Sequence, residues 1–163
     1  MKRKVKYSKY CTITTSAIFI TLCALTLYTF IEGPTTAGLV IVGVILCLNI
    51  SGAYFAPLNI EASPDFVETK MLARRKIIPL KDIVTVQSCK PTMGAIRICG
   101  SGGYLGYWGW FREGDIGKYF AYYGRASDCF LLTLSDGRKY MLGCTDSHNM
   151  AAYIRQHIKH TIK

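Results

Sequence analysis

Two long runs without a charged residue constrain this chain more than any other feature. Residues 11–31 and 37–58 contain no Asp, Glu, Lys or Arg, and the short polar segment 32–36 separates them. At about 1.5 Å per residue, a helix of about twenty residues crosses the roughly 30 Å hydrocarbon core of a bilayer. Neither run has a polar stripe, so each helix would be apolar on all sides. We therefore predict two transmembrane helices joined by a turn at residues 32–36.

Two other interpretations of the apolar runs are weaker. A helical hairpin buried in a soluble core would need far more surrounding chain than residues 59–163 provide. A cleaved signal peptide fits the basic start, but the first run is longer than the usual apolar region of a signal. No small-x-small cleavage site closes that run, and a second apolar run follows at once.

Charge is distributed unevenly around the two runs. Residues 1–10 hold five basic residues and no acid, the turn at 32–36 has no Lys or Arg, and basic residues return after the second run. Because Lys and Arg are enriched in cytoplasmic loops, we predict that both termini are cytoplasmic. The chain carries 20 Lys and Arg against 10 Asp and Glu. Phospholipid accounts for the N-terminal excess, and without a nucleic-acid motif we expect no nucleic-acid partner.

From residue 59 onward the pattern is typical of short strands. Alternating or β-branched segments bounded by Gly, Pro and Asp predict strands at 66–72, 76–80, 83–88, 96–99, 119–123, 130–135 and 138–142. Asp136-Gly137 is a two-residue hairpin signal. A turn at those two residues would place Ser135 opposite Arg138 and Cys129 opposite Cys144.

The C-terminal segment predicts an amphipathic helix. Ser147 can cap it, and apolar residues follow at a spacing of four, which places on one face Met150, Ile154, Ile158 and Ile162. We expect this helix to cover an open end or face of the sheet. The predicted fold class is therefore membrane-anchored α+β, with two transmembrane helices, a partly open β-barrel of about seven strands in residues 59–163, and a helix that caps it.

Three segments resemble the bacterial PH (pleckstrin homology-like) domain membrane proteins. They are residues 78–83 (IPLKDI), the Gly-rich residues 100–109 (GSGGYLGYWG) and residues 132–140 (LTLSDGRKY). The resemblance covers residues 58–163. It implies a PH-like fold joined to membrane helices in the bacterial inner membrane, and it implies no particular chemistry.

The Gly-rich stretch lacks the Lys-Ser or Lys-Thr of a phosphate loop and the third glycine of a dinucleotide fingerprint. Its glycines can serve bulges and close backbone approach, with Trp108 filling the barrel. The aromatic residues are many for one small core, and exposed apolar patches usually mark interfaces. We expect Trp110 and Phe111 to be exposed and to contact lipid or a second copy of the domain. The interaction candidates are Tyr104, Tyr107, Trp108, Trp110 and Phe111.

A basic triplet, Arg74-Arg75-Lys76, occupies a predicted turn between strands. It resembles the early turn whose basic residues bind phosphoinositide headgroups in eukaryotic PH domains. A solvated turn is the favoured interpretation, and weak contact with anionic lipid is the alternative. The headgroup candidates are this triplet together with the N-terminal Lys2, Arg3, Lys4, Lys6 and Lys9.

The sequence nominates no catalytic residue, metal site or cofactor. It contains no C-x-x-C motif, and two packed thiols are the favoured interpretation of Cys129 and Cys144 over a disulfide or half of a metal site. The leading hypothesis is a non-catalytic membrane-anchored module that binds a protein partner or assembles with itself. A sensor of anionic lipid headgroups or of a small ligand is the second hypothesis. An enzyme, or an accessory subunit of one, is the third.

Overall fold

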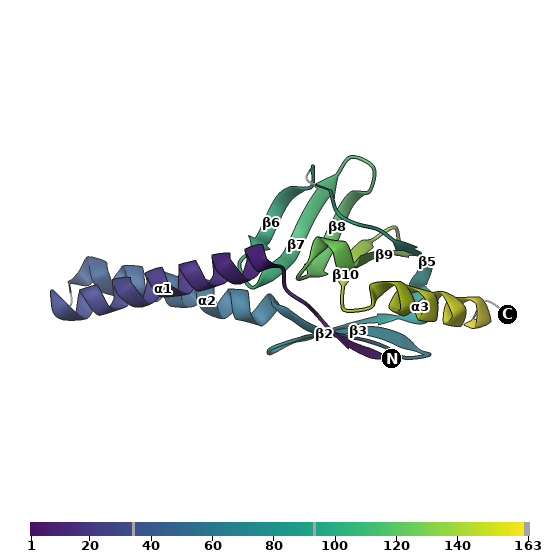
Figure 1. Cartoon of the computed structure of the whole chain (residues 1–163), viewed down its shortest axis with the longest axis horizontal. Helices are drawn as coiled ribbons and strands as arrows, with labels where there is room; N and C mark the ends of the chain where they lie inside the picture. Colours follow the sequence, from purple (N-terminus) through teal and green to yellow (C-terminus); the bar gives the residue numbers. More distant parts are fainter. Residues whose placement is uncertain (34, 93, 162–163) are drawn as a thin grey trace.

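The computed structural model describes residues 1–33, 35–92 and 94–161, the last three of them by backbone alone. Two long helices project as a hairpin from one end of a domain (Figure 1). The domain consists of two β-sheets and a C-terminal helix, and the first residues of the chain belong to it.

The helical hairpin consists of α1 (Lys9–Ile31) and α2 (Thr36–Phe55). The side chains of Ser8 and Thr35 cap these helices, each accepting a hydrogen bond at 3.1 Å from the N–H three residues later. Both helices are long and apolar enough to cross a membrane. Their most apolar windows are 0% and 11% buried, so they are not core helices of a soluble domain. Their exposed apolar surface indicates association with a membrane.

The first sheet brings together the two ends of the helical hairpin. Its strand order is β1-β2-β3-β4, with bounds β1 (Lys2–Lys4), β2 (Pro57–Ala62), β3 (Phe66–Met71) and β4 (Arg75–Pro79). β1 pairs antiparallel with β2, Lys4 opposite Asn59, and Val5 follows it into the core with 8% exposure. The N-terminal segment is therefore an integral part of the domain, whereas the sequence suggested a separate basic tail.

The second sheet has the order β5-β9-β10-β8-β7-β6. Its strands are β5 (Ile83–Ser88), β6 (Ile96–Gly103), β7 (Gly106–Glu113), β8 (Gly117–Tyr123), β9 (Cys129–Leu134) and β10 (Lys139–Gly143). Neighbours are antiparallel except β10 and β8, which are parallel. Two short 3₁₀ helices, η1 (Leu80–Asp82) and η2 (Ala126–Asp128), precede β5 and β9. The sheets stay separate rather than closing into one barrel, in agreement with the partly open fold that was predicted.

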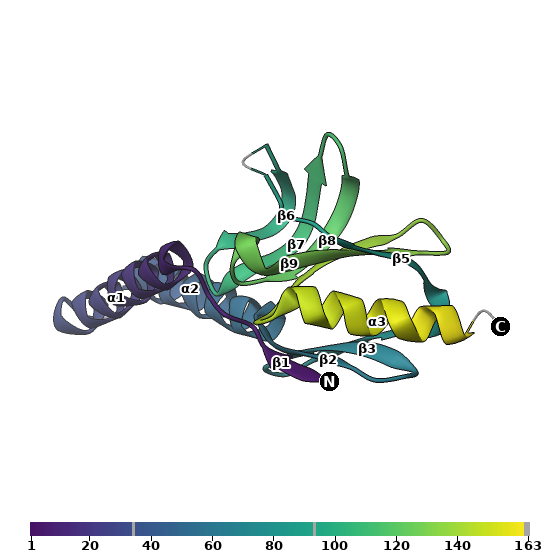
Figure 2. The ribbon, with the colours of Figure 1, turned by 45° about the vertical axis from the view of Figure 1, so that its right-hand side comes forward.

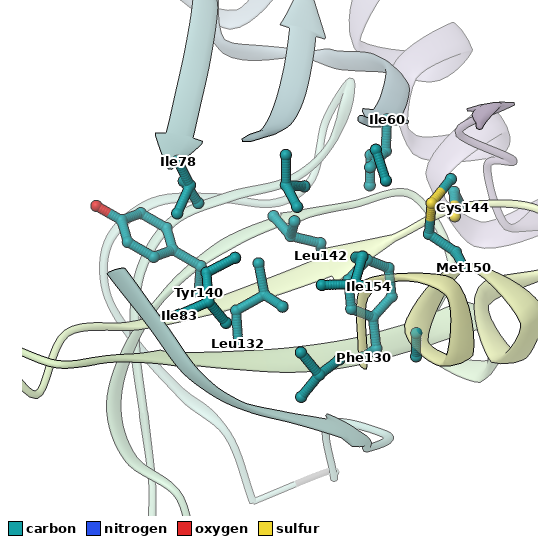
Figure 3. Close-up of a cluster of buried hydrophobic side chains, with 14 of the residues drawn as sticks. Ile60, Ile78, Ile83, Phe130, Leu132, Tyr140, Leu142, Cys144, Met150 and Ile154 are labelled. Atoms are coloured by element: carbon teal, nitrogen blue, oxygen red, sulfur yellow. The ribbon is translucent and has the colours of Figure 1, made fainter. Parts of the chain in front are cut away.

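The helix α3 (Ser147–Thr161) lies between the two sheets (Figure 2). Met150 and Ile154 are 0% exposed and Ile158 is 7% exposed, which confirms the predicted apolar face. Ile162 lies outside the described residues. Ser147 is the first residue of the helix rather than a cap before it. This face completes the main core with side chains from both sheets, among them Ile60, Ile78, Phe130, Leu132 and Leu142 (Figure 3).

The β9–β10 hairpin differs by one residue from the predicted pairing. Cys129 lies opposite Gly143, not opposite Cys144. The turn holds three residues, 135–137, because Gly137 adopts a φ of +81° and donates its N–H to the Leu134 carbonyl at 3.0 Å. A glycine in the left-handed conformation commonly ends a three-residue hairpin turn. The Asp-Gly pair alone did not distinguish this turn from the two-residue form.

Six of the seven predicted strands agree with the structure to within two residues at both ends, and the one at residues 96–99 is longer. Within the described residues, three further strands were not predicted. β1 is three basic residues, β2 overlaps the end of the predicted second membrane helix, and β7 is interrupted by glycine. Each lacks the local apolar alternation on which strand prediction depends.

Candidate membrane-proximal interaction surface

The Gly-rich aromatic segment forms the β6–β7 hairpin, whose two strands approach unusually closely. Gly100 and Gly109 are directly paired and have φ values of +123° and +114°. A Cβ on Gly109 would lie 2.2 Å from the carbonyl oxygen of Cys99, and one on Gly100 would lie 2.1 Å from that of Trp108. Only glycine permits both the backbone conformation and this approach. The segment is therefore strand, and strand alternation decides where each aromatic ring points.

The tip of this hairpin contacts both helices. The Leu105 N–H donates to Thr15 Oγ1 of α1 at 3.0 Å, and the Tyr104 hydroxyl hydrogen-bonds to Asn49 Oδ1 of α2. Gly52 of α2 leaves the space for the Tyr104 ring, because a Cβ there would lie 2.8 Å from it. The hairpin is thus attached to the part of the helices nearest the domain (Figure 1).

The tryptophans and Tyr107 are half-buried, and each contacts other side chains through its ring. Trp108 stacks on Phe55 at the end of α2, with ring centroids 5.1 Å apart. Tyr107 stacks on Tyr123 of β8 at 4.7 Å. The ring of Trp110 is covered by Lys118, whose Nζ lies 4.6 Å from the ring centroid. Trp108 therefore joins the sheet to α2, Tyr107 and Trp110 pack on β8, and each ring keeps part of its surface accessible.

The expectation that Phe111 is exposed is wrong. Its side chain is 4% exposed and stacks on Tyr119, with ring centroids 6.0 Å apart. Phe111 lies on the opposite face of β7 from Trp110, where it enters a second core cluster with Tyr123 and Met141. An adjacent pair of aromatic residues in a strand must point to opposite faces, and the sequence interpretation had treated the pair as a loop.

The outer edge of β6 is the most exposed apolar feature of the domain's second sheet. β6 is the last strand of that sheet and has eight residues. Ile96 is 69% exposed and Ile98 is 53% exposed, and Cys99 beside them is also exposed. The sequence predicted a strand here, but only the strand order shows that it is an edge.

The basic triplet does not form a single cluster. The Arg74 guanidinium lies over the Phe55 ring, 5.8 Å from its centroid. Arg75 approaches the Glu68 carboxylate at 3.8 Å, and Lys76 lies 5.4 Å from the centroid of the Tyr140 ring. Leu72, in the β3–β4 turn, is exposed. The residue before it, Met71, pairs with Pro57 at the start of β2.

The N-terminal basic residues also separate in space. Lys2, Arg3 and Lys4 are exposed on β1, and Arg3 forms an ion pair with Asp146 at 3.0 Å. Lys6 is exposed in the segment before α1, and Lys9 is the first residue of that helix. Only Lys6 and Lys9 therefore lie next to the start of the helical hairpin.

A polar network crosses the first sheet. Lys70 Nζ lies 3.1 Å from Glu61 Oε2 and 3.4 Å from Glu68 Oε2. The hydrogen bond from Lys70 lowers the pKa of Glu61, and the bonds to Glu61 and Glu68 raise the pKa of Lys70. These charges satisfy one another and leave no open site in the network.

The buried cysteines are unpaired thiols. Cys129 and Cys144 are both buried and free, and burial raises the pKa of Cys144 to about 12. A thiol held in its protonated form is a poor nucleophile and a poor metal ligand. Among residues 1–33, 35–92 and 94–161, no group of three or more His, Cys, Asp or Glu side chains is placed to hold a metal ion.

The fold and this surface define a PH-like domain carried on two apolar helices. The family model for the bacterial PH domain matches residues 58–158, and the chain belongs to that family. The match confirms the resemblance noted in the sequence. No curated protein and no solved structure gives a significant match to the chain. PH domains are generally non-catalytic.

Proposed function

We propose that this protein is a non-catalytic, membrane-anchored PH module that assembles with further copies of itself through the outer edge of β6. The observation that carries the proposal is the exposed pair Ile96 and Ile98 on β6, an eight-residue edge strand that pairs with β7 on one side alone. A strand edge with free backbone groups and apolar side chains is a template for pairing with another strand.

The other sheet edges of the described domain are protected. β1 is only three residues long and entirely basic. β4 carries Arg75 and Lys76 and ends on Pro79, which cannot donate a ladder hydrogen bond. β5 is covered by α3, where Arg155 Nε donates to the Val86 carbonyl at 3.1 Å. Short, charged, proline-terminated or covered edges resist pairing, so β6 is the edge available to a partner.

The membrane anchor favours such assembly. Two helices inserted in one membrane confine every copy to a plane and a fixed orientation, which raises the effective concentration of the β6 edges. The charges near the helices support insertion of the helices in the bacterial inner membrane with the domain on the cytoplasmic side. Lys6, Lys9 and Arg74 lie at the domain end of the helices, whereas the distal turn carries Glu32 and no Lys or Arg.

The test is the mass of the full-length protein in detergent, measured by light scattering. We expect a discrete oligomer for the parent and a monomer for Ile98→Lys. Val84→Lys on β5 is the matched control, because Val84 is 56% exposed against 53% for Ile98. A monomeric parent, or an Ile98→Lys variant with the parent's mass, would contradict assembly through β6. A broad activity screen on the same preparation tests the absence of catalysis.

Contact of the β3–β4 turn with anionic lipid is the second candidate function. Its support is the placement of Leu72, 69% exposed, beside Arg74 at the end of α2. An apolar residue next to a basic one suits a membrane surface. The test uses a helix-free domain that retains β1 and asks whether it floats together with vesicles of anionic lipid. Loss of flotation on changing Arg74, Arg75 and Lys76 together supports the contact, and unchanged flotation counts against it.

A further inference from the structure

A cleft lies where β6 passes the two helices, separate from the outer β6 residues Ile96 and Ile98. Its volume is about 320 Å³. The helical wall is mainly apolar, with Asn49 and Ser51 as its polar residues, and the sheet wall carries polar side chains, among them Arg97, Ser101 and Trp108. The helical wall is formed mainly by Ile18, Leu22, Ile45 and Leu48. One side of the cleft is therefore suited to hydrocarbon and the other to a polar group.

One charged donor on the sheet wall, the exposed guanidinium of Arg97, has no acceptor among the residues that the structure describes. Arg97 makes no hydrogen bond or ion pair there. Its guanidinium folds back along β6, because Nη1 lies 3.1 Å from the position that a Cβ on Gly102 would take. The indole Nε1 of Trp108 is also unpartnered among these residues, but it is buried and not open to the cleft, so a ligand there does not reach it. A guanidinium is the group on this wall that an anionic oxygen binds most strongly.

The length of the helices places this cleft at the lipid boundary. Beyond the hairpin contacts at Thr15 and Asn49, the free parts of the helices are residues 16–31 and 36–48. At about 1.5 Å per residue they measure about 24 Å and about 20 Å. Both are shorter than the roughly 30 Å hydrocarbon core. In a bilayer the hairpin tip and the cleft therefore lie at or just below the headgroups, where a charge needs a counter-ion.

The cleft continues into a groove between the helices. A second hollow of about 440 Å³ shares Leu22, Ile45 and Asn49 with it. Its other lining residues include Phe19 and Leu27 of α1. A molecule with an anionic head and a hydrocarbon chain would meet polar donors at one end of this continuous track and apolar side chains along the rest.

We propose that the cleft binds one anionic phospholipid, with the phosphate on Arg97 and one acyl chain in the groove between α1 and α2. The lipid supplies an acceptor for the Arg97 guanidinium and covers apolar surface on the helices. This inference rests on the proposed insertion of the helices in a membrane and is independent of self-assembly through β6.

The test uses the full-length protein in mixed micelles with phosphatidylglycerol, and native mass spectrometry counts the retained lipid. We expect one lipid per chain. Arg97→Gln should weaken retention by about tenfold, the effect of losing one charge-assisted hydrogen bond. Arg112→Gln is the matched control, because Arg112 is an exposed arginine of β7 that does not line the cleft. Ile45→Trp fills the track without touching the charge and should also abolish retention.

Three outcomes would overturn the proposal. They are equal retention by Arg97→Gln and the parent, equal retention of uncharged diacylglycerol, and displacement of the lipid by millimolar inorganic phosphate. The last would assign the site to a free anion. Alkaline extraction of membranes distinguishes a failure of the lipid-site proposal from a failure of the proposed membrane insertion. Release of the protein by alkali refutes membrane insertion, whereas an inserted protein without bound lipid refutes the cleft site alone.

Discussion

Replacing Gly109 with alanine should disrupt the β6–β7 hairpin on which both proposals depend. At a φ of +114°, an L-residue is strained by at least about 1–2 kcal/mol. The new Cβ would also lie 2.2 Å from the Cys99 carbonyl oxygen and 2.7 Å from the Cα of Gly100. These are backbone atoms of a paired strand, so relief requires the strands to separate, and overpacking of this kind costs about 1–3 kcal/mol.

The combined cost is about 2–5 kcal/mol, which for a chain of this length lowers the melting temperature by at least about 5 °C. Thermal unfolding in detergent, followed by tryptophan fluorescence, is the direct assay, because Trp108 and Trp110 flank the substituted position. Gly114→Ala is the control. A Cβ on Gly114 has no atom within 4 Å, so we expect a change within about 0.5 kcal/mol. Equal melting temperatures for the two variants would refute the reasoning.

Three further predictions concern the domain core. A fragment of residues 58–163 lacks β1, so it should melt below a helix-free version in which residues 1–5 are joined to residue 58 by a short turn; equal melting in circular dichroism would show that β1 is dispensable. Ile154→Ala should cost about 2–5 kcal/mol in chemical denaturation, because Ile154 is 0% exposed, whereas the exposed Gln156→Ala should cost less than about 0.5 kcal/mol. Burial raises the pKa of Cys144 and Tyr122 to about 12 from ordinary values of 9.0 and 10.0. The folded state holds these protons more tightly, so stability is full below about pH 9 and falls as the pH rises toward 12; a melting temperature that stays constant from pH 8 to pH 11 would contradict this.

The structure explains which parts of the candidate surface could be foreseen. The Gly-rich aromatic segment was recognisable as special because its residue types are unusual. The prediction that Phe111 is exposed was wrong because Gly100 and Gly109 pair and make the segment two antiparallel strands. Strand pairing is a non-local arrangement, which the residue types alone do not reveal. Arg97 carried no signal in the sequence, since its importance depends on the helices that lie across the cleft from it.

The amino-acid sequence by itself determined the features that depend on neighbours along the chain. Uncharged runs longer than twenty residues specify the two apolar helices, and a four-residue apolar spacing specifies the buried face of α3. Short strands between Gly, Pro and Asp were visible for the same reason, together with the resemblance to the bacterial PH domain.

Tertiary structure alone decided the features that depend on residues far apart in the chain. β1 becomes a strand only because β2 lies beside it, more than fifty residues later. β6 is an edge only because of the strand order, and Cys129 faces Gly143 because a left-handed Gly137 adds one residue to the turn. Pairing partners, edges and register are set by which strands meet when the core closes, and local sequence patterns do not contain that information.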